Sequence, residues 1–243
     1  MYKKAIMGRI SMFLGVVVLG GLLAGLALAS GGASMTPDQA LQKLMAGNKQ
    51  YVQGQTNGAK LSGPKTRASL AKSQKPYAVI LSCSDSRVPP EIIFNKGMGE
   101  IFVIRDAGNV PVPAVVGSIE YAVEHLGSPL IMVLGHERCG AVTATVDAHG
   151  ESSGSPNVDS ILKEIEPSIE VAKKHCHLCE GSPKCPEISK DALIECAIDE
   201  NAKSIAANLP AQSKIIKELL EEKKLKIVAA KYDLDTGVVT LFK

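Results

Sequence analysis

The chain has 243 residues, 45% of them hydrophobic but only 4% aromatic, and its formal net charge is +2. This length allows one sizeable domain with a largely aliphatic core. The scarcity of aromatic rings and the absence of Trp argue against a surface that stacks nucleic-acid bases. The near-neutral charge gives no indication of a polyanionic partner.

The first 29 residues have the pattern of an export signal. Three basic residues precede an uncharged apolar run over residues 10–29, and Ala27-Leu28-Ala29 fits a signal-peptidase site. The alternative is an uncleaved membrane anchor, since about 18 apolar residues can just span a bilayer. Removing residues 1–29 removes three positive charges and takes the net charge to −1. We expect an exported protein, periplasmic or secreted, that contacts a membrane only if this segment stays uncleaved.

A Gly/Ser linker over residues 30–35 precedes the predicted folded domain, residues 36–243. Thr36 and Pro37 suit the start of a helix that the apolar spacing predicts to about residue 52. Residues 53–70 show little periodicity and are expected to form a loop.

Short apolar runs then alternate with helical patterns. Buried strands are predicted over residues 77–82, 101–104 and 130–134, with a helix over 113–126 between the last two. Such runs without polar alternation indicate a parallel sheet that is covered on both faces.

The C-terminal half continues the helical patterns. A helix is expected to start near Gly140, and another over 157–174 should bend or break at Pro167. Two more, over 189–208 and 211–224, should be separated at Pro210. A fourth strand over 225–230, a turn over 233–237 and a fifth strand over 238–242 read as an antiparallel hairpin. The predicted fold is α/β, with a mainly parallel sheet of about four strands, a C-terminal antiparallel strand and helices on both faces.

Three residues have the types and positions of a catalytic zinc site. Cys83 follows the first predicted strand, and His136 and Cys139 follow the third. In parallel sheets, ligands bind beyond the carboxyl ends of the strands. A set of two thiolates and one imidazole leaves the fourth tetrahedral position of zinc for water or a carboxylate. We expect one zinc ion per chain.

Asp85 and Arg87 lie within four residues of Cys83 and predict a catalytic pair. Zinc lowers the pKa of bound water toward about 7, and Asp85 is placed to orient the resulting hydroxide. Arg87 could hold Asp85 off the metal in a bidentate ion pair. The sequence therefore predicts a site with two states: Asp85 is paired with Arg87 when active and becomes the fourth zinc ligand when closed.

These motifs resemble the β-class carbonic anhydrases. The matching segments run in family order from about residue 36 to the C-terminus: Cys83-Ser-Asp-Ser-Arg-Val-Pro-Pro-Glu91, Phe102-Val-Ile-Arg-Asp-Ala-Gly-Asn109, Gly135-His-Glu-Arg-Cys-Gly-Ala141 and Tyr232-Asp-Leu-Asp-Thr-Gly237. The resemblance implies reversible hydration of carbon dioxide to bicarbonate and a proton. It also implies a homodimer, or a dimer of dimers, with the active site at the subunit interface.

Two other functions fit the same residues. The first is hydrolysis of carbonyl sulfide or carbon disulfide on the same fold and metal. The second is a zinc- or redox-responsive binding protein in which Asp85 stays on the metal. The intact set of metal-ligating and acidic residues argues against the second of these.

A cysteine-rich segment over residues 175–187 has no equivalent in the family pattern and is expected to be an insertion. With the later Cys196, its Cys176, Cys179 and Cys185 make four cysteines beyond the zinc set. In an exported protein they would form two disulfides, with three connectivities open. An additional metal site using His175 or His177 and free thiols are the alternatives.

Overall fold

The computed structural model describes residues 35–56, 62–176 and 188–243. Within these ranges no helix is both long enough and apolar enough to span a membrane. The segment predicted to be a signal peptide or anchor lies outside the described residues, so that expectation stays a prediction.

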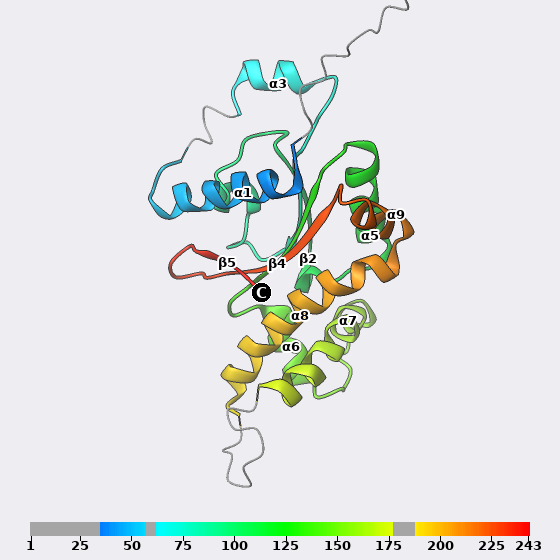
Figure 1. The fold of residues 1–243 in the computed structure, drawn as a ribbon. Helices are drawn as coiled ribbons and strands as arrows, with labels where there is room; N and C mark the ends of the chain where they lie inside the picture. The colour runs from blue at the N-terminus through cyan, green and yellow to red at the C-terminus, as the bar shows by residue number, and fades with distance from the viewer. Residues whose placement is uncertain (1–34, 57–61, 177–187) are drawn as a thin grey trace, which may run out of the picture. The chain divides into compact units, whose positions relative to one another are not determined.

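A mixed five-stranded sheet forms the centre of the described chain (Figure 1). Its strands are β1 (Ala78–Cys83), β2 (Ile101–Asp106), β3 (Leu130–His136), β4 (Lys226–Tyr232) and β5 (Val239–Leu241). The strand order is β2-β1-β3-β4-β5. The first four strands are parallel and β5 pairs antiparallel with β4. This arrangement confirms the predicted fold class.

The strands alternate with helices along the chain. The helices are α1 (Pro37–Val52), α3 (Pro64–Leu70), α4 (Pro90–Ile93), α5 (Pro113–Glu120), α6 (Gly140–Ala148), α7 (Pro156–His175), α8 (Lys190–Gln212) and α9 (Lys214–Glu221). A short 3-10 segment, η1 (Ala107–Asn109), follows β2, and a π-helical turn, η2 (Tyr121–His125), continues α5. The helix predicted over 113–126 is therefore formed, with its last turn widened.

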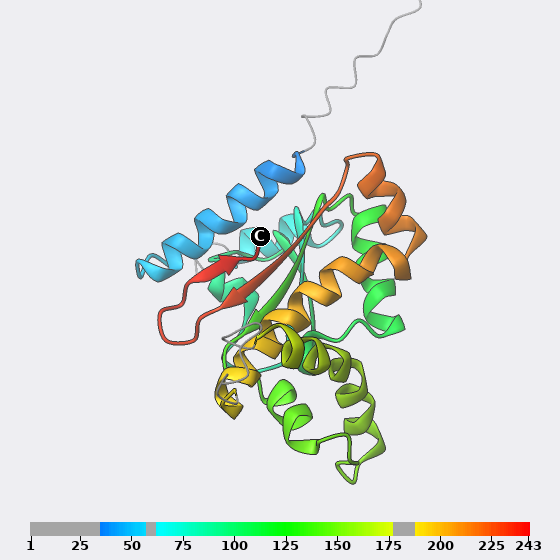
Figure 2. The ribbon, with the colours of Figure 1, turned by 60° about the horizontal axis from the view of Figure 1, so that its bottom comes forward.

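Two hydrophobic layers cover the two faces of the sheet. Successive strand residues point to opposite faces, so Ile80 packs with α1 and α4, whereas Leu81 packs with α5, α8 and α9. Figure 2 shows α1 on one side of the sheet and α8 on the other. Because both faces are covered, β1 and β3 are buried along their whole length.

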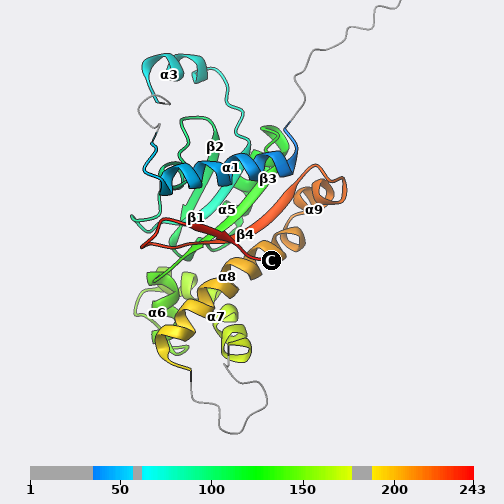
Figure 3. The same ribbon diagram turned by 60° about the vertical axis from the view of Figure 1, so that its left-hand side comes forward.

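A third cluster lies beyond the carboxyl ends of the strands. It joins α6, α7 and the first half of α8 through aliphatic residues, and it includes Cys83 and Cys139. Figure 3 shows these three helices gathered at that end of the sheet. The candidate metal ligands are thus enclosed by packed helices at one edge of the sheet.

The start of the first helix agrees with its sequence. Thr36 accepts a hydrogen bond from the backbone N–H of Gln39 at 3.2 Å, and the Gln39 side chain accepts one from the backbone N–H of Thr36 at 2.9 Å. These two bonds form a capping box. Pro37 occupies the first turn, as expected.

The loop predicted over residues 53–70 is wrong in its last part, where α3 forms. This helix starts with Pro64 after Gly63 and buries none of its residues. Apolar periodicity marks only helices that pack on a core, so nothing in the pattern indicated this one. The single-turn helix α4 was missed as well.

The predicted separation of two helices at Pro210 is wrong, and of the bend or break predicted at Pro167 the break does not occur. Pro167 and Pro210 lie inside α7 and α8, which continue through them. The boundary between α8 and α9 lies at Ser213, whose side chain caps α9 by accepting from Ile216 N–H at 3.2 Å. Packing of Ile165, Ile169 and other buried residues offsets the local cost of Pro167 in α7.

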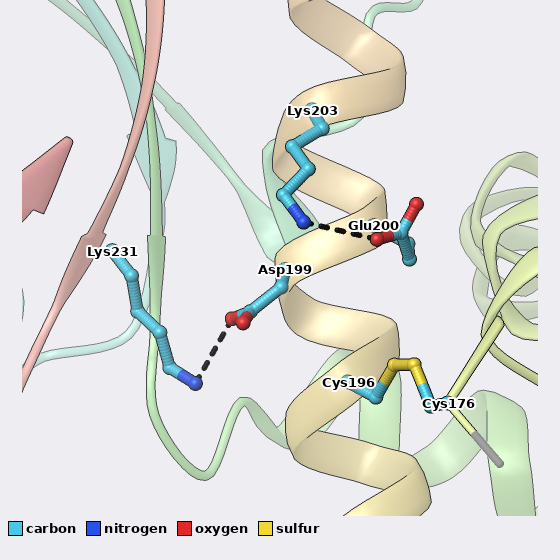
Figure 4. The surroundings of a disulfide bond; sticks show 6 residues. All are labelled: Cys176, Cys196, Asp199, Glu200, Lys203 and Lys231. Carbon is cyan, nitrogen blue, oxygen red and sulfur yellow. Dashed lines mark hydrogen bonds and ion pairs between the residues drawn. A yellow bond between two sulfur atoms is a disulfide. The ribbon is translucent and has the colours of Figure 1, made fainter. Parts of the chain in front are cut away.

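A disulfide joins Cys176, at the end of α7, to Cys196 in α8 (Figure 4). The two Cα atoms are 6.4 Å apart, within the range that a disulfide spans. Two disulfides with three possible connectivities were predicted among the four cysteines, and the structure forms the bond between Cys176 and Cys196. Cys179 and Cys185 lie outside the described residues, so their pairing stays a prediction.

Replacing both Cys176 and Cys196 with Ser should lower the free energy of unfolding by about 3 kcal/mol, because an open loop raises the entropy of the unfolded chain. Urea denaturation followed by circular dichroism measures this change. The zinc content should not change, since neither sulfur belongs to the predicted ligand set. An unchanged denaturation midpoint would show that the bond is not formed in solution.

Candidate metal centre

The structure brings the three predicted metal ligands together. Cys83 is the last residue of β1, His136 is the last residue of β3, and Cys139 directly precedes α6. Their ligand atoms all lie within 4.8 Å of one another. The three residues are 4%, 0% and 2% exposed. Adjacent parallel strands therefore deliver a buried Cys2His set to one point at the edge of the sheet.

His136 has the arrangement expected of a metal-binding imidazole. Its Nδ1 lies 2.9 Å from the backbone oxygen of Glu137, a contact that requires Nδ1 to carry the proton. Its Nε2 then has a free lone pair, and this buried atom has no hydrogen-bond partner within the described structure. A metal ion would satisfy Nε2, and the backbone contact would fix the ring for it.

The two thiols also fit a divalent cation. The contact between the two sulfur atoms lowers the pKa of Cys83 and raises the pKa of Cys139. Cys83 accepts a further hydrogen bond from the backbone N–H of Gly108 at 3.4 Å. The backbone N–H groups of Ala141 and Val142, at the start of α6, partly offset the rise in the pKa of Cys139. Two thiolates this close repel each other, and a bound dication would stabilise both.

Asp85 and Arg87 form a bidentate ion pair beside the ligands. Arg87 Nε donates to Asp85 Oδ1 at 2.9 Å and Arg87 Nη2 donates to Asp85 Oδ2 at 2.7 Å. The Arg87 backbone N–H donates to Oδ1 as well, at 2.9 Å. The hydrogen bond from Arg87 holds the pKa of Asp85 well below its usual range. Asp85 Oδ2 lies 4.0 Å from His136 Nε2, so an ionised carboxylate borders the ligand cluster.

Several residues that support this site were not identified from the sequence. Arg105, in β2, donates to the backbone oxygens of Cys83 at 2.9 Å and Asp85 at 2.6 Å, and so fixes the loop after β1. Asn201, in α8, is 2% exposed and donates to the Gly108 oxygen at 3.0 Å. Arg105 lies near the carboxyl end of β2, at the same end of the sheet as the candidate ligands, which could have indicated a role. Nothing in the sequence connects Asn201 with a loop 93 residues away.

Gly108 meets two requirements at once. Its φ is +72°, in the left-handed region that favours glycine. A Cβ at this position would also lie 2.6 Å from Ile165 Cδ1 and 3.2 Å from the Ala141 Cβ. A residue without a side chain therefore lets α7 pack directly against the loop whose N–H reaches Cys83.

Comparison with known proteins agrees with this geometry. A family model described as carbonic anhydrase matches residues 78–239, which span β1 to β4, the first residue of β5 and the three candidate ligands. Carbonic anhydrase 2 of Mycobacterium tuberculosis is 38% identical over 206 residues, covering 84% of this chain and 92% of the relative. The chain belongs to the β-carbonic anhydrase family. The family enzymes are carbonic anhydrases that use zinc, and none of these matches supports the alternative of a hydrolase acting on carbonyl sulfide or carbon disulfide.

Solved structures of the family share the fold. The β-carbonic anhydrase CafA of Aspergillus fumigatus superposes with a TM-score of 0.63 at 25% identity and covers 85% of this chain and 90% of its own. A second matching structure is described as that of two tetrameric β-carbonic anhydrases from Sordaria macrospora. Its chain superposes with a TM-score of 0.62 at 23% identity, and the match covers 74% of this chain and 87% of that one.

Replacing Cys139 with Ser should abolish zinc retention, because the site would lose one of two charged sulfur ligands. Zinc measured by atomic emission on gel-filtered protein tests this prediction. The variant with Ser at both Cys176 and Cys196 is a matched control, since it also removes sulfur but should keep its zinc. Full zinc occupancy after the Cys139 replacement would overturn the ligand assignment.

Proposed function

We propose that Cys83, His136 and Cys139 bind one zinc ion per chain, and that the enzyme hydrates carbon dioxide reversibly with the help of Asp85 and Arg87. The observation that carries this proposal is the position of Asp85, an ionised carboxylate 4.0 Å from the unpartnered Nε2 of His136. A water molecule in that space would contact both the metal site and the carboxylate.

Zinc, when bound, supplies a Lewis acid that lowers the pKa of a coordinated water molecule. The residues of the chain then control the water and its proton. Oδ2 of Asp85 keeps a lone pair that can accept a hydrogen bond from this water, because it accepts only from Arg87 Nη2, whereas Oδ1 accepts from both Arg87 Nε and the Arg87 backbone N–H. Asp85 thereby orients the oxygen of the water toward carbon dioxide.

Arg87 has a second function in this proposal, which is to keep Asp85 away from the metal. The ion pair holds both carboxylate oxygens in a fixed plane, and Arg87 Nη2 also donates to the Arg138 backbone oxygen at 3.3 Å. The conformation with Asp85 paired to Arg87 corresponds to the active state. In the closed state, Asp85 would release Arg87 and become the fourth ligand.

We further propose that the enzyme is exported, as the N-terminal pattern over residues 1–29 predicts, and that it assembles as a homodimer or a dimer of dimers. The tetrameric description of the Sordaria macrospora relatives supports an oligomer. Its partners would be carbon dioxide and bicarbonate, with no nucleic acid, and it would contact a membrane only through an uncleaved N-terminus.

Stopped-flow hydration of carbon dioxide by the purified chain, with zinc assayed on the same sample, tests the proposed activity. We expect fast turnover with one zinc per chain and a rate that rises from about pH 6.5 to 9 as the coordinated water loses its proton. Full zinc without turnover of carbon dioxide at any pH would overturn the proposal. Carbonyl sulfide would then be the next substrate to assay.

Replacing Asp85 with Asn should lower kcat/KM by about 100-fold while zinc is retained, because an uncharged amide cannot form the same bidentate pair with Arg87 and so cannot orient the water in the same way. Stopped-flow rates and zinc content measure the two effects. Ser86, which lies between Asp85 and Arg87, is exposed. Replacing Ser86 with Ala is the matched control and should change the rate by less than about twofold. A near-normal rate for the Asp85 variant would remove this residue from the mechanism.

A further inference from the structure

The loop between the second and third ligands contains a residue in an unfavourable backbone conformation. Arg138, which directly precedes Cys139, has a φ of +51°. For residues other than glycine this left-handed region is uncommon and costs roughly 1 kcal/mol. Such a conformation persists only where surrounding contacts hold it. Here it reverses the chain so that His136 and Cys139 reach the same point.

One carboxylate binds the backbone of Arg138. The backbone N–H of Arg138 donates to Glu195 Oε1 at 2.9 Å, although the two residues are 57 positions apart. The backbone oxygen of Arg138 accepts a hydrogen bond from Arg87 Nη2 at 3.3 Å, within the loops that carry the candidate ligands. Its side chain pairs with Asp235 at 3.0 Å. Glu195 is thus the contact that ties this backbone to a different element, helix α8.

Glu195 is itself held in place. Its Oε2 lies 2.6 Å from Lys231 Nζ, and Lys231 also pairs with Asp199 at 2.9 Å (Figure 4). Lys231 is only 19% exposed and its strand position pairs with Gly135, next to His136. Helix α8 also packs closely on β3: a Cβ added to Gly135 would lie only 3.4 Å from the Ala202 Cβ. Glu195 therefore projects from a helix that is fixed against the end of β3.

We propose that Glu195 is a positioning residue for the metal centre: it holds Arg138 in the left-handed conformation that brings Cys139 to the same point as Cys83 and His136. This inference rests on the proposed zinc site. Among the described residues, Glu195 forms no hydrogen bond or ion pair with the three candidate ligands or with Asp85, so we assign its effect on the site to its hydrogen bond with the Arg138 backbone. Outer contacts of this kind commonly change metal affinity 10- to 100-fold when they are removed.

The test measures zinc release to a chromophoric chelator and the visible spectrum of the cobalt-substituted protein. Glu195→Ala should release zinc about tenfold faster than the parent and alter the cobalt spectrum. Glu195→Gln keeps an oxygen acceptor for the Arg138 N–H and should stay close to the parent. Asp199→Asn weakens the same ionic cluster without touching Arg138, and should also stay close to the parent.

A second substitution separates positioning from a general loss of stability. Glycine adopts positive φ readily, so in a protein that carries Arg138→Gly, adding Glu195→Ala should accelerate zinc release by less than about threefold. An equal effect of Glu195→Ala in both backgrounds, or equal effects of Glu195→Ala and Asp199→Asn, would overturn the inference. If the parent protein retains no zinc, the proposed function fails instead, and the two failures are distinguishable.

Discussion

The parallel pairing of β1 with β3 is the constraint on which the site depends. Paired parallel strands lie about 4.8 Å apart and end at the same edge of the sheet. Cys83 and His136 are the last residues of these two strands, so the sheet itself sets the separation of two of the candidate ligands. The third ligand then needs only a short turn into α6. The aliphatic layers on both faces stabilise the pairing and thereby the metal geometry.

Helix α8 connects the two loops that carry the cysteines. Asn201 binds the Gly108 oxygen, and the N–H of Gly108 reaches Cys83. Glu195 binds the backbone next to Cys139. One helix from the second half of the chain therefore contacts the supports of both sulfur ligands. The disulfide at Cys196 anchors the same helix to α7, so the elements around the centre form one connected framework.

The sequence predicted the parts of the structure that repeat or that carry distinctive chemistry. Buried strands are continuous apolar runs, and Cys83, His136 and Cys139 are rare residue types at strand ends, so both were identified. The helix boundary predicted at Pro210 was wrong, and α7 continues through Pro167, because tertiary packing outweighed the local preference of proline. Helix α3 buries none of its residues, so its sequence shows no apolar periodicity that would have predicted it. Glu195 and Asn201 act across long separations on backbone groups, and single-sequence patterns contain no information about such contacts.

The absence of a side chain at Gly108 also links two parts of the protein that could otherwise vary separately. Ile165 Cδ1 occupies the volume that any larger residue at position 108 would need. A smaller residue in place of Ile165 would free that volume but would leave the positive φ unchanged. A substitution of Gly108 would therefore require both a smaller side chain at position 165 in α7 and a change in the backbone conformation at position 108. The buried face of α7 is therefore restricted by the loop that donates a hydrogen bond to Cys83.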